Sequence, residues 1–216
     1  SADLRGVSRL QNGTIDMGAY EWTAGVDPHH TGPMTLYVDA SAEGANIGNS
    51  WTDAFVSLQV ALDVALAGDE IWVAKGVYKP SSAYDLAVDG NRDYHFRMVD
   101  GVSIYGGFFF FEVSVSERTD FGPGGANETI LSGDIGAEGD HTDNCFHVFF
   151  HPAGSLSPGS VLDGFTIKDG RADGVAPHNQ GGGFYGQSVN PFINNCTFSN
   201  NEASEQGGGM FNADYA

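Results

Sequence analysis

The chain has 216 residues, a length that suits one main hydrophobic core rather than two full-sized domains. Its 28 Asp and Glu residues against 9 Lys and Arg give a formal net charge of −19, which disfavours nucleic acid because phosphates would be repelled. The 31 glycines stand beside 15 Phe and 8 Tyr, so tight turns are expected to alternate with buried aromatic positions. No apolar run is long enough for a membrane span.

The first segment, residues 1–22, ends in an alternating pattern that predicts a short strand from Gly13 to Trp22. Residues 23–33 contain Asp-Pro, His-His and Gly-Pro without periodicity, which is typical of a linker. We therefore expect a boundary there and a second, larger unit over residues 34–216.

An amphipathic helix is expected near the start of this larger unit. Apolar residues recur at helical spacing over 51–67, and Gly68 follows as a stop signal. Extended segments are expected at Leu36–Asp39 before the helix, and at Glu70–Ala74 and Gly76–Pro80 after it.

From Phe96 onward the sequence predicts only short strands, separated by turns rich in Gly, Asn and Asp. The expected strands are Phe96–Val99, Val102–Tyr105, Thr129–Leu131, Phe146–Phe150, Ser160–Leu162, Phe165–Ile167, Phe192–Ile193 and Thr197–Phe198. Strands this short offer few inward side chains, so none can close a core alone.

Two internal repeats show how such strands would stack. Gly181-Gly-Gly-Phe-Tyr185 recurs 26 residues later as Gly207-Gly-Gly-Met-Phe211, and Val161–Lys168 resembles Phe192–Ser199, with Thr166 aligned to Thr197. Repeats of this length bury their apolar residues by stacking in parallel, with interior side chains in ladders. The sequence therefore predicts an all-β parallel solenoid, whose open end the helix at 51–67 would cap.

Several blocks resemble known proteins. Leu36-Tyr-Val-Asp39, Asn49-Ser-Trp-Thr-Asp-Ala-Phe55 and Gly68-Asp-Glu-Ile-Trp-Val-Ala-Lys-Gly-Val-Tyr-Lys-Pro80 resemble the opening of bacterial secreted right-handed β-helix repeat proteins. Asp100-Gly-Val-Ser-Ile-Tyr-Gly-Gly-Phe108 and Asn195-Cys-Thr-Phe198 are similar to later turns of the same pectate-lyase-like superfamily, which includes polymorphic outer-membrane-type repeats. The resemblance implies a right-handed parallel β-helix with an N-terminal amphipathic capping helix.

The first segment resembles a different part of such proteins. Gly13-Thr-Ile-Asp-Met-Gly-Ala-Tyr-Glu21 is similar to the closing strand of a domain of the choice-of-anchor class. Residues 1–22 are thus expected to be the closing strand of a preceding unit or a joining strand, and the capped β-helix over 34–216 is expected to continue beyond Ala216. Ser1 begins no signal peptide, so the export signal is expected to lie outside this sequence.

The resemblance implies an extracellular or cell-surface protein with a structural or adhesive role. It would be the repeating subunit of a surface fibre that associates head to tail or with neighbouring repeats. The alternative is a carbohydrate-active, polysaccharide lyase-like enzyme or a carbohydrate-binding β-helix. Lyases on this fold combine carboxylates with a basic proton acceptor. The local cluster that holds both charges is Lys168, Asp169, Arg171 and Asp173.

The densest carboxylate segment is a candidate Ca²⁺ site, because hard oxygen ligands at short spacing suit that ion. Its ligands would be Asp134, Glu138, Asp140, Asp143 and Asn144. The spacing does not match an EF-hand, so a solvated turn stays open as the alternative. The segment from Asp85 to Asp93 ranks lower because Arg92 would neutralise it, and the spacing of Cys145 and Cys196 does not decide whether they pair.

Overall fold

The computed structural model describes residues 10–11, 14–15, 32–82, 90–154 and 156–213. The chain divides into two compact units, Ser1–Thr31 and Gly32–Ala216. In the first unit, β1 (Leu10–Gln11) pairs antiparallel with β2 (Thr14–Ile15). The rest of the segment predicted over 1–22, and all but the end of the predicted linker, lie outside the described residues.

Over its described residues, the second unit consists mainly of short strands with one α-helix, α1 (Leu58–Val64), and two 3₁₀ turns, η1 (Gly90–Asp93) and η2 (Val115–Glu117). Its strands are β3 (Thr35–Val38), β4 (Glu70–Ala74), β5 (Gly76–Tyr78), β6 (Ser103–Phe108), β7 (Thr129–Ser132), β8 (Phe149–His151), β9 (Val161–Asp163), β10 (Thr166–Lys168), β11 (Arg171–Ala172), β12 (Phe184–Gln187), β13 (Phe192–Asn194), β14 (Thr197–Ser199), β15 (Glu202–Ala203) and β16 (Met210–Ala213).

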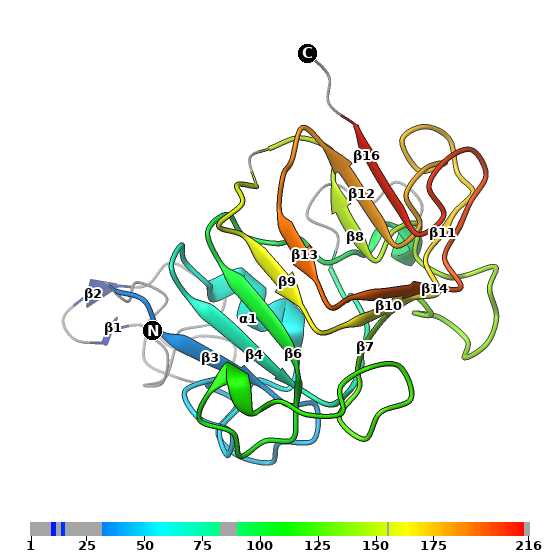
Figure 1. Ribbon diagram of the computed structural model, residues 1–216. Helices are drawn as coiled ribbons and strands as arrows, with labels where there is room; N and C mark the ends of the chain where they lie inside the picture. The colour runs from blue at the N-terminus through cyan, green and yellow to red at the C-terminus, as the bar shows by residue number, and fades with distance from the viewer. Residues whose placement is uncertain (1–9, 12–13, 16–31, 83–89, 155, 214–216) are drawn as a thin grey trace. The chain divides into compact units, whose positions relative to one another are not determined.

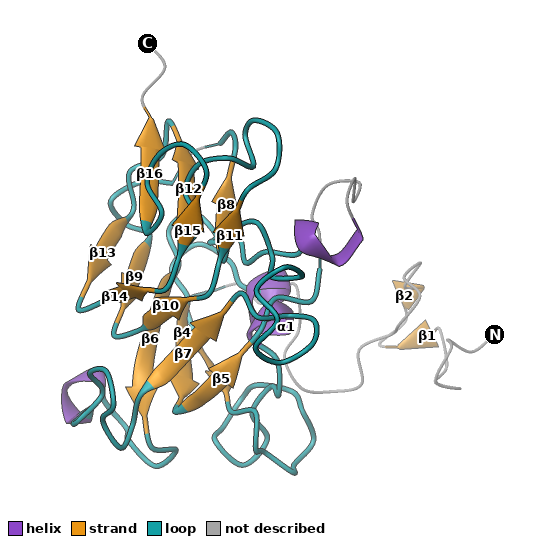
Figure 2. Ribbon diagram, turned by 90° about the vertical axis from the view of Figure 1, so that its right-hand side faces the viewer, coloured by secondary structure: helices purple, strands orange, loops and turns teal. Residues whose placement is uncertain are grey.

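Every strand pair described in this unit is parallel. The sheets have the orders β13-β9-β6-β4-β3, β14-β10-β7-β5, β16-β12-β8 and β11-β15, so each sheet advances in chain order. Figure 1 shows the five-stranded sheet as a row from β3 to β13, and Figure 2 shows the row of β8, β12 and β16. The predicted all-β class with parallel sheets is confirmed.

The two repeats found in the sequence set the register of two sheets. Thr166 of β10 lies opposite Thr197 of β14. Phe184 of β12 lies opposite Met210 of β16. Equivalent residues of the two repeats are therefore hydrogen-bonded neighbours, as parallel stacking requires.

The core consists of side-chain ladders that follow this register. Leu36, Ile71, Ile104 and Leu162 are register partners on four adjacent strands, and all four are fully buried. A second ladder joins Phe149 to Phe184, whose ring centroids are 5.9 Å apart. Because each strand contributes only one or two such residues, apolar burial comes from contacts between strands rather than within one strand.

The helix predicted over 51–67 is shorter than expected, and that prediction is wrong at both ends. α1 covers only 58–64 and contacts β3 and β4. Phe55 instead forms a parallel bridge with Val38 beside β3, and the Trp51 ring packs against Tyr37 at 4.8 Å. Trp51 and Phe55 fit the helical spacing of apolar residues, but an extended segment packed beside a sheet can bury the same two side chains. Their spacing therefore did not identify a helix.

Two of the predicted strands also differ. The segment Phe96–Val99 makes only one bridge, from Phe96 to Phe149. The strand expected over Phe146–Phe150 is shifted to β8, because the Phe146 ring stacks on the His178 ring at 4.8 Å. An apolar run does not by itself say which of its residues join the ladder.

Replacing Phe149 with Ala removes a fully buried ring from the centre of its ladder. We expect the free energy of unfolding to fall by about 3–5 kcal/mol, since a cavity adds to the lost burial. Urea denaturation followed by circular dichroism measures the change. Val175→Ala is the control, because Val175 is 83 % exposed and its loss should change stability by less than about 0.5 kcal/mol. Equal losses in the two variants would contradict this core.

Candidate functional site

The predicted calcium loop folds around two of its five candidate ligands. Oδ2 of Asp134 accepts a hydrogen bond from the Gly139 amide at 3.0 Å. Oδ2 of Asp143 accepts one from the Ala137 amide at 2.8 Å. Since these amides lie in one turn, the structure brings both carboxylates onto the same short stretch of backbone.

The other acidic candidates lie at the exposed tip of the loop. Asp140 accepts hydrogen bonds from the amide and hydroxyl of Thr142, and these bonds lower the pKa of its carboxyl group. Glu138 is also exposed. Within the described residues, no group of three or more His, Cys, Asp or Glu side chains is arranged to hold a metal ion.

In the lower-ranked segment, Asp85 and Asp89 lie outside the described residues. Its Arg92 is engaged elsewhere, since its guanidinium donates to the carboxylate of Asp173 at 2.6 Å. The sequence predicted that Arg92 would neutralise carboxylates of its own segment, but in the structure it pairs with Asp173.

The four lyase-type candidates form ion pairs with one another. Lys168 Nζ lies 3.2 Å from the carboxylate of Asp169, and Arg171 Nε lies 3.2 Å from that of Asp173. Asp169 is buried, and it also accepts a hydrogen bond from Ser132 Oγ. Pairing of this kind favours a role in fixing the turns after β10 and β11 over a role as free base and open metal ligand.

Both cysteines are free, in positions that do not favour reaction. Cys145 is buried and Cys196 is half-buried. Burial raises the pKa of the Cys145 thiol to about 12 and that of Cys196 to about 11. Because the thiolate is the reactive form, neither residue suits nucleophilic chemistry near neutral pH.

The structure brings together a histidine cluster, His147 and His178, that the sequence did not predict. His147 Nε2 lies 3.0 Å from His178 Nδ1, while its Nδ1 lies 2.8 Å from the Gly181 carbonyl oxygen. The Phe150 ring stacks on His147 at 4.6 Å, and His178 Nε2 lies 3.8 Å from the Asp93 carboxylate. His147 and His178 are 31 residues apart, but the adjoining strands pair Phe149 with Phe184 at an offset of 184 − 149 = 35, so the repeat spacing gave no signal for this pair.

A buried ion pair was also missed. Arg118 donates to the Asp163 carboxylate at 2.8 Å, and the two side chains are only 7 % and 8 % exposed. The amides of Asn194 and Asn195 donate to the other oxygen of the same carboxylate. Asn195 has a φ of 47°, a left-handed backbone conformation that Asn tolerates better than most residues. These bonds tie the end of β9 to the end of β13.

One groove of about 510 Å³ combines an aromatic ring with charged groups. Its charged residues are Asp39, Lys75 and Glu128, and the exposed apolar residues Val77 and Phe110 also line it. Phe110 has a φ of 97°, a strained value for a bulky residue. The buried carboxylate of Glu112 holds this conformation by accepting from the Phe110 amide at 3.1 Å.

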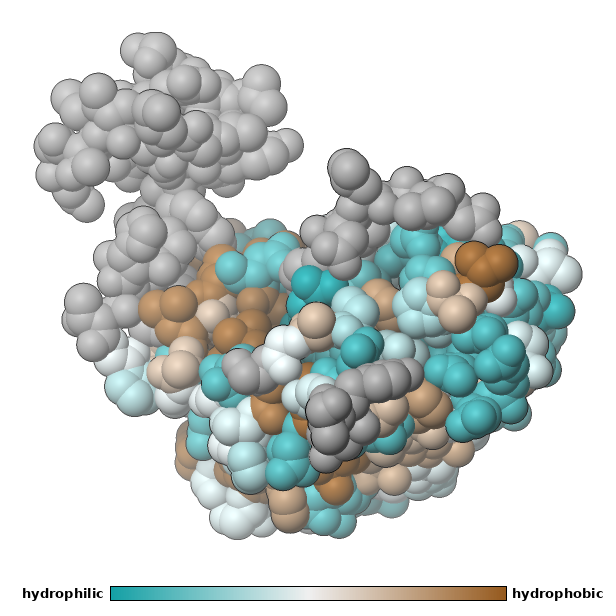
Figure 3. Space-filling model, turned by 90° about the horizontal axis from the view of Figure 1, so that it is seen from above, coloured by the Kyte–Doolittle hydropathy of each residue, from teal (hydrophilic) through white to brown (hydrophobic). Residues whose placement is uncertain are grey.

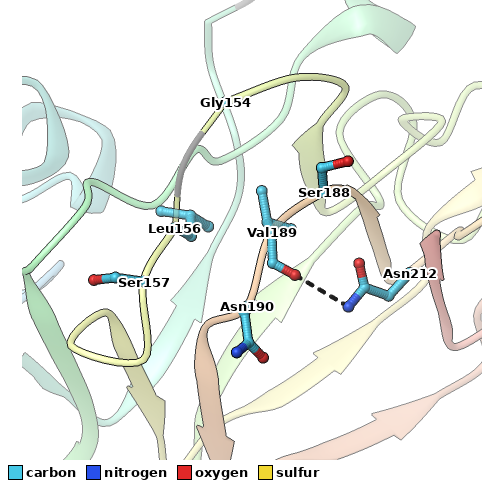
Figure 4. A pocket seen from close by; sticks show the side chains of 7 residues that line it. All are labelled: Gly154, Leu156, Ser157, Ser188, Val189, Asn190 and Asn212. Atoms are coloured by element: carbon cyan, nitrogen blue, oxygen red, sulfur yellow. Dashed lines mark hydrogen bonds between the residues drawn. The ribbon is translucent and has the colours of Figure 1, made fainter. Parts of the chain in front are cut away.

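A second hollow, of about 460 Å³, lies beside β12 and β16 (Figure 4). Its lining residues are Gly154, Leu156, Ser157, Ser188, Val189, Asn190 and Asn212. Their side chains are hydroxyl, amide or apolar, and Asn212 is held by a bond to the Val189 carbonyl oxygen. Because none is ionisable near neutral pH, this hollow does not supply general acid or base chemistry.

The last strand of each of the three larger sheets is poorly covered. β13, β14 and β16 contain no buried residue, although their register partners on β9, β10 and β12 are largely buried. Phe192 is 54 % exposed and Met210 is 39 % exposed. Seen from above, the surface has hydrophobic patches among hydrophilic residues (Figure 3). Strand edges of this kind pair readily with another strand.

No family model, curated protein or solved structure matches the chain. Function is therefore inferred from the chemistry of its own residues. Among the helices that the structure describes, none is both long and apolar enough to cross a membrane.

Two buried histidines, His147 and His151, predict acid sensitivity. Burial lowers the folded-state pKa of His147, and likewise of His151, to about 3 from an ordinary value of 6.5. The unfolded chain therefore takes up protons first, so stability falls as the pH drops below 6.5. Between pH 7 and pH 5 each histidine should cost about 2 kcal/mol. Urea titrations at both values measure the loss.

A matched pair of variants tests the source of this loss. His147→Gln should reduce the difference between pH 7 and pH 5, because one buried titrating ring is removed. His141→Gln should leave the difference unchanged, since His141 is exposed. The same pH dependence in both variants would show that His147 is not its source.

Proposed function

We propose that the chain is an extracellular structural or adhesive module, built as a right-handed parallel β-helix whose last rung stacks on a further rung. The chain-order sheets and their shared register support a coil in which each strand lies on its equivalent one turn earlier. Connections between parallel strands are right-handed in about 98 % of cases, which supports that hand. The contacts of α1 with β3 and β4 support its role as the cap of the first rung.

The observation that carries the proposal is the uncovered edge formed by β13, β14 and β16. We assign this edge to a second copy of the chain, in a head-to-tail contact that repeats and so builds a fibre. Residues 1–22 of the next copy, which resemble a closing strand, would supply the pairing strand. Contacts of this kind do not close on themselves, so they extend the assembly.

The charge of the chain sets conditions for assembly. A net charge of −19 makes copies repel one another at low ionic strength, and salt screens that repulsion. Association should therefore strengthen as salt is added. The same acidic surface suits solubility outside a cell and agrees with the secreted proteins that the sequence resembles.

Charges placed on the edge should block assembly without harming the fold. Phe192 and Met210 are exposed, so Phe192→Glu with Met210→Glu adds to the repulsion between acidic copies and should shift sedimentation velocity profiles from assemblies to monomers, by at least about tenfold in association constant. Val175→Glu is the control, because it adds a negative charge at an exposed site outside β13, β14 and β16. Wild-type protein that stays monomeric at physiological salt would rule out self-assembly.

A second candidate function is carbohydrate binding in the groove at Phe110. Sugar rings stack their apolar faces on aromatic rings, while carboxylates and amines bind their hydroxyl groups. Phe110, whose strained backbone is fixed by Glu112, lines the groove together with Asp39, Lys75 and Glu128. An aromatic ring and charged groups in one groove suit the binding of a sugar. The ion-paired state of Lys168 and Asp169 favours binding over lyase activity.

Removing the ring tests this alternative. Phe110→Ala should weaken binding of any bound polysaccharide by about tenfold or more in titration calorimetry against a panel of neutral and acidic glycans. Phe111→Ala is the control, because Phe111 is exposed on the same loop but does not line the groove. Heat signals absent from the whole panel would eliminate the alternative, and an unsaturated product absorbing in the ultraviolet would instead reveal a lyase.

A further inference from the structure

Three buried oxygen atoms of the 134–144 loop have no hydrogen-bond partner. They are Oδ1 of Asp134, Oδ1 of Asp143 and Oδ1 of Asn144. Buried acceptors are nearly always satisfied, so an orphaned group calls for an unseen partner. Three such atoms within eleven residues point to one shared partner rather than to three unrelated ones.

The backbone places these residues at the base of one loop. The Cys145 amide donates to the Gly133 carbonyl oxygen at 2.8 Å, which closes the loop and sets Asn144 beside Asp134. Asp143 directly precedes Asn144. Both carboxylates use Oδ2 to bind amides of the same turn, so each has its other oxygen free of hydrogen bonds.

The orientation of the Asn144 amide is fixed. Asn144 is only 2 % exposed, and its Nδ2 donates to the Asp169 carbonyl oxygen at 2.7 Å. A flipped amide would set oxygen against oxygen, so Oδ1 is the end without a partner. An amide oxygen fixed without a donor, on the residue that follows Asp143, suits a cation, which needs acceptors only.

We propose that Asp134, Asp143 and Asn144 bind one Ca²⁺ ion through their Oδ1 atoms. Ca²⁺ accepts carboxylate and amide oxygens together and tolerates irregular geometry, with water and backbone carbonyls completing six to eight ligands. Two carboxylates balance its charge. This ligand set is smaller than the five predicted from the sequence, because Glu138 and Asp140 lie exposed at the loop tip.

Two cations face the site. Lys79 Nζ lies 3.9 Å from Asp134 Oδ1, an ion-pair distance too long for a hydrogen bond, and its side chain is half-exposed. Ca²⁺ would displace this flexible ammonium group into solvent. Arg92 donates instead to the Asn144 carbonyl oxygen, which leaves the Asn144 side chain unaffected.

The bound ion would join successive turns of the fold. Asn144 contacts Asp169, which follows β10, while Asp134 follows β7, the register neighbour of β10. An ion held at this point would bind only the folded chain and therefore stabilise it. This role is independent of assembly through the last rung, because none of the three ligands lies on β13, β14 or β16.

Titration calorimetry of the chelator-treated protein with CaCl₂ tests the proposal. We expect saturable binding with a dissociation constant of roughly 0.1–1 mM, as in extracellular calcium modules, and a rise in melting temperature on adding the ion. Asp143→Asn should weaken binding about tenfold or more. Asp140→Asn is the matched control, since it removes the same charge from the same loop and should change affinity less than about twofold.

Lys79→Ala supplies an independent check. Removal of the competing ammonium group should tighten Ca²⁺ binding several-fold, whereas unchanged affinity would place the ion away from Asp134. If Asp143→Asn does not fold by circular dichroism, Asp134→Asn takes its place. Folded wild-type protein that shows neither heat nor a melting shift at about 10 mM Ca²⁺ would overturn the site, as would equal losses in Asp143→Asn and Asp140→Asn.

Discussion

The structure of the larger unit depends on parallel backbone hydrogen bonding between equivalent strands of successive repeats. β9 has three residues, and only Leu162 among them lies in the aliphatic ladder. Such a strand becomes stable only when neighbours pair with both of its edges and extend its ladder. Each strand therefore depends on its neighbours, and β13, β14 and β16 end their sheets with one edge that no other described strand pairs with.

Polar groups at the corners serve the same stacking. The Asp163 carboxylate receives Arg118 from a loop and two amides from the corner after β13. These bonds satisfy a buried charge and join the ends of β9 and β13, which are adjacent strands of one sheet. The chain has only 9 Lys and Arg residues, and one of them, Arg118, is buried in this ion pair. We infer that Arg118 stabilises the fold at this position.

The candidate binding sites lie on the long loops between strands. The loop between β6 and β7 places Phe110 at the groove. The loop between β7 and β8 contains the buried oxygens of Asp134, Asp143 and Asn144 that have no hydrogen-bond partner. Regular stacking supplies a rigid base, and loops on that base are free to vary without breaking the ladder. The fold thus separates stability, which the strands provide, from binding, which we assign to the loops.

The sequence by itself determined the strand class, the parallel stacking and two registers, because a repeat such as Thr166 and Thr197 must align when its units stack. It also located the acidic loop. Only the tertiary structure decided where α1 begins and that His147 meets His178. It alone also separated the buried acceptors of that loop from the exposed carboxylates at its tip. The reason is physical: spacing along the chain reveals the repeat period, whereas burial and hydrogen bonding depend on neighbours that lie far away in the sequence.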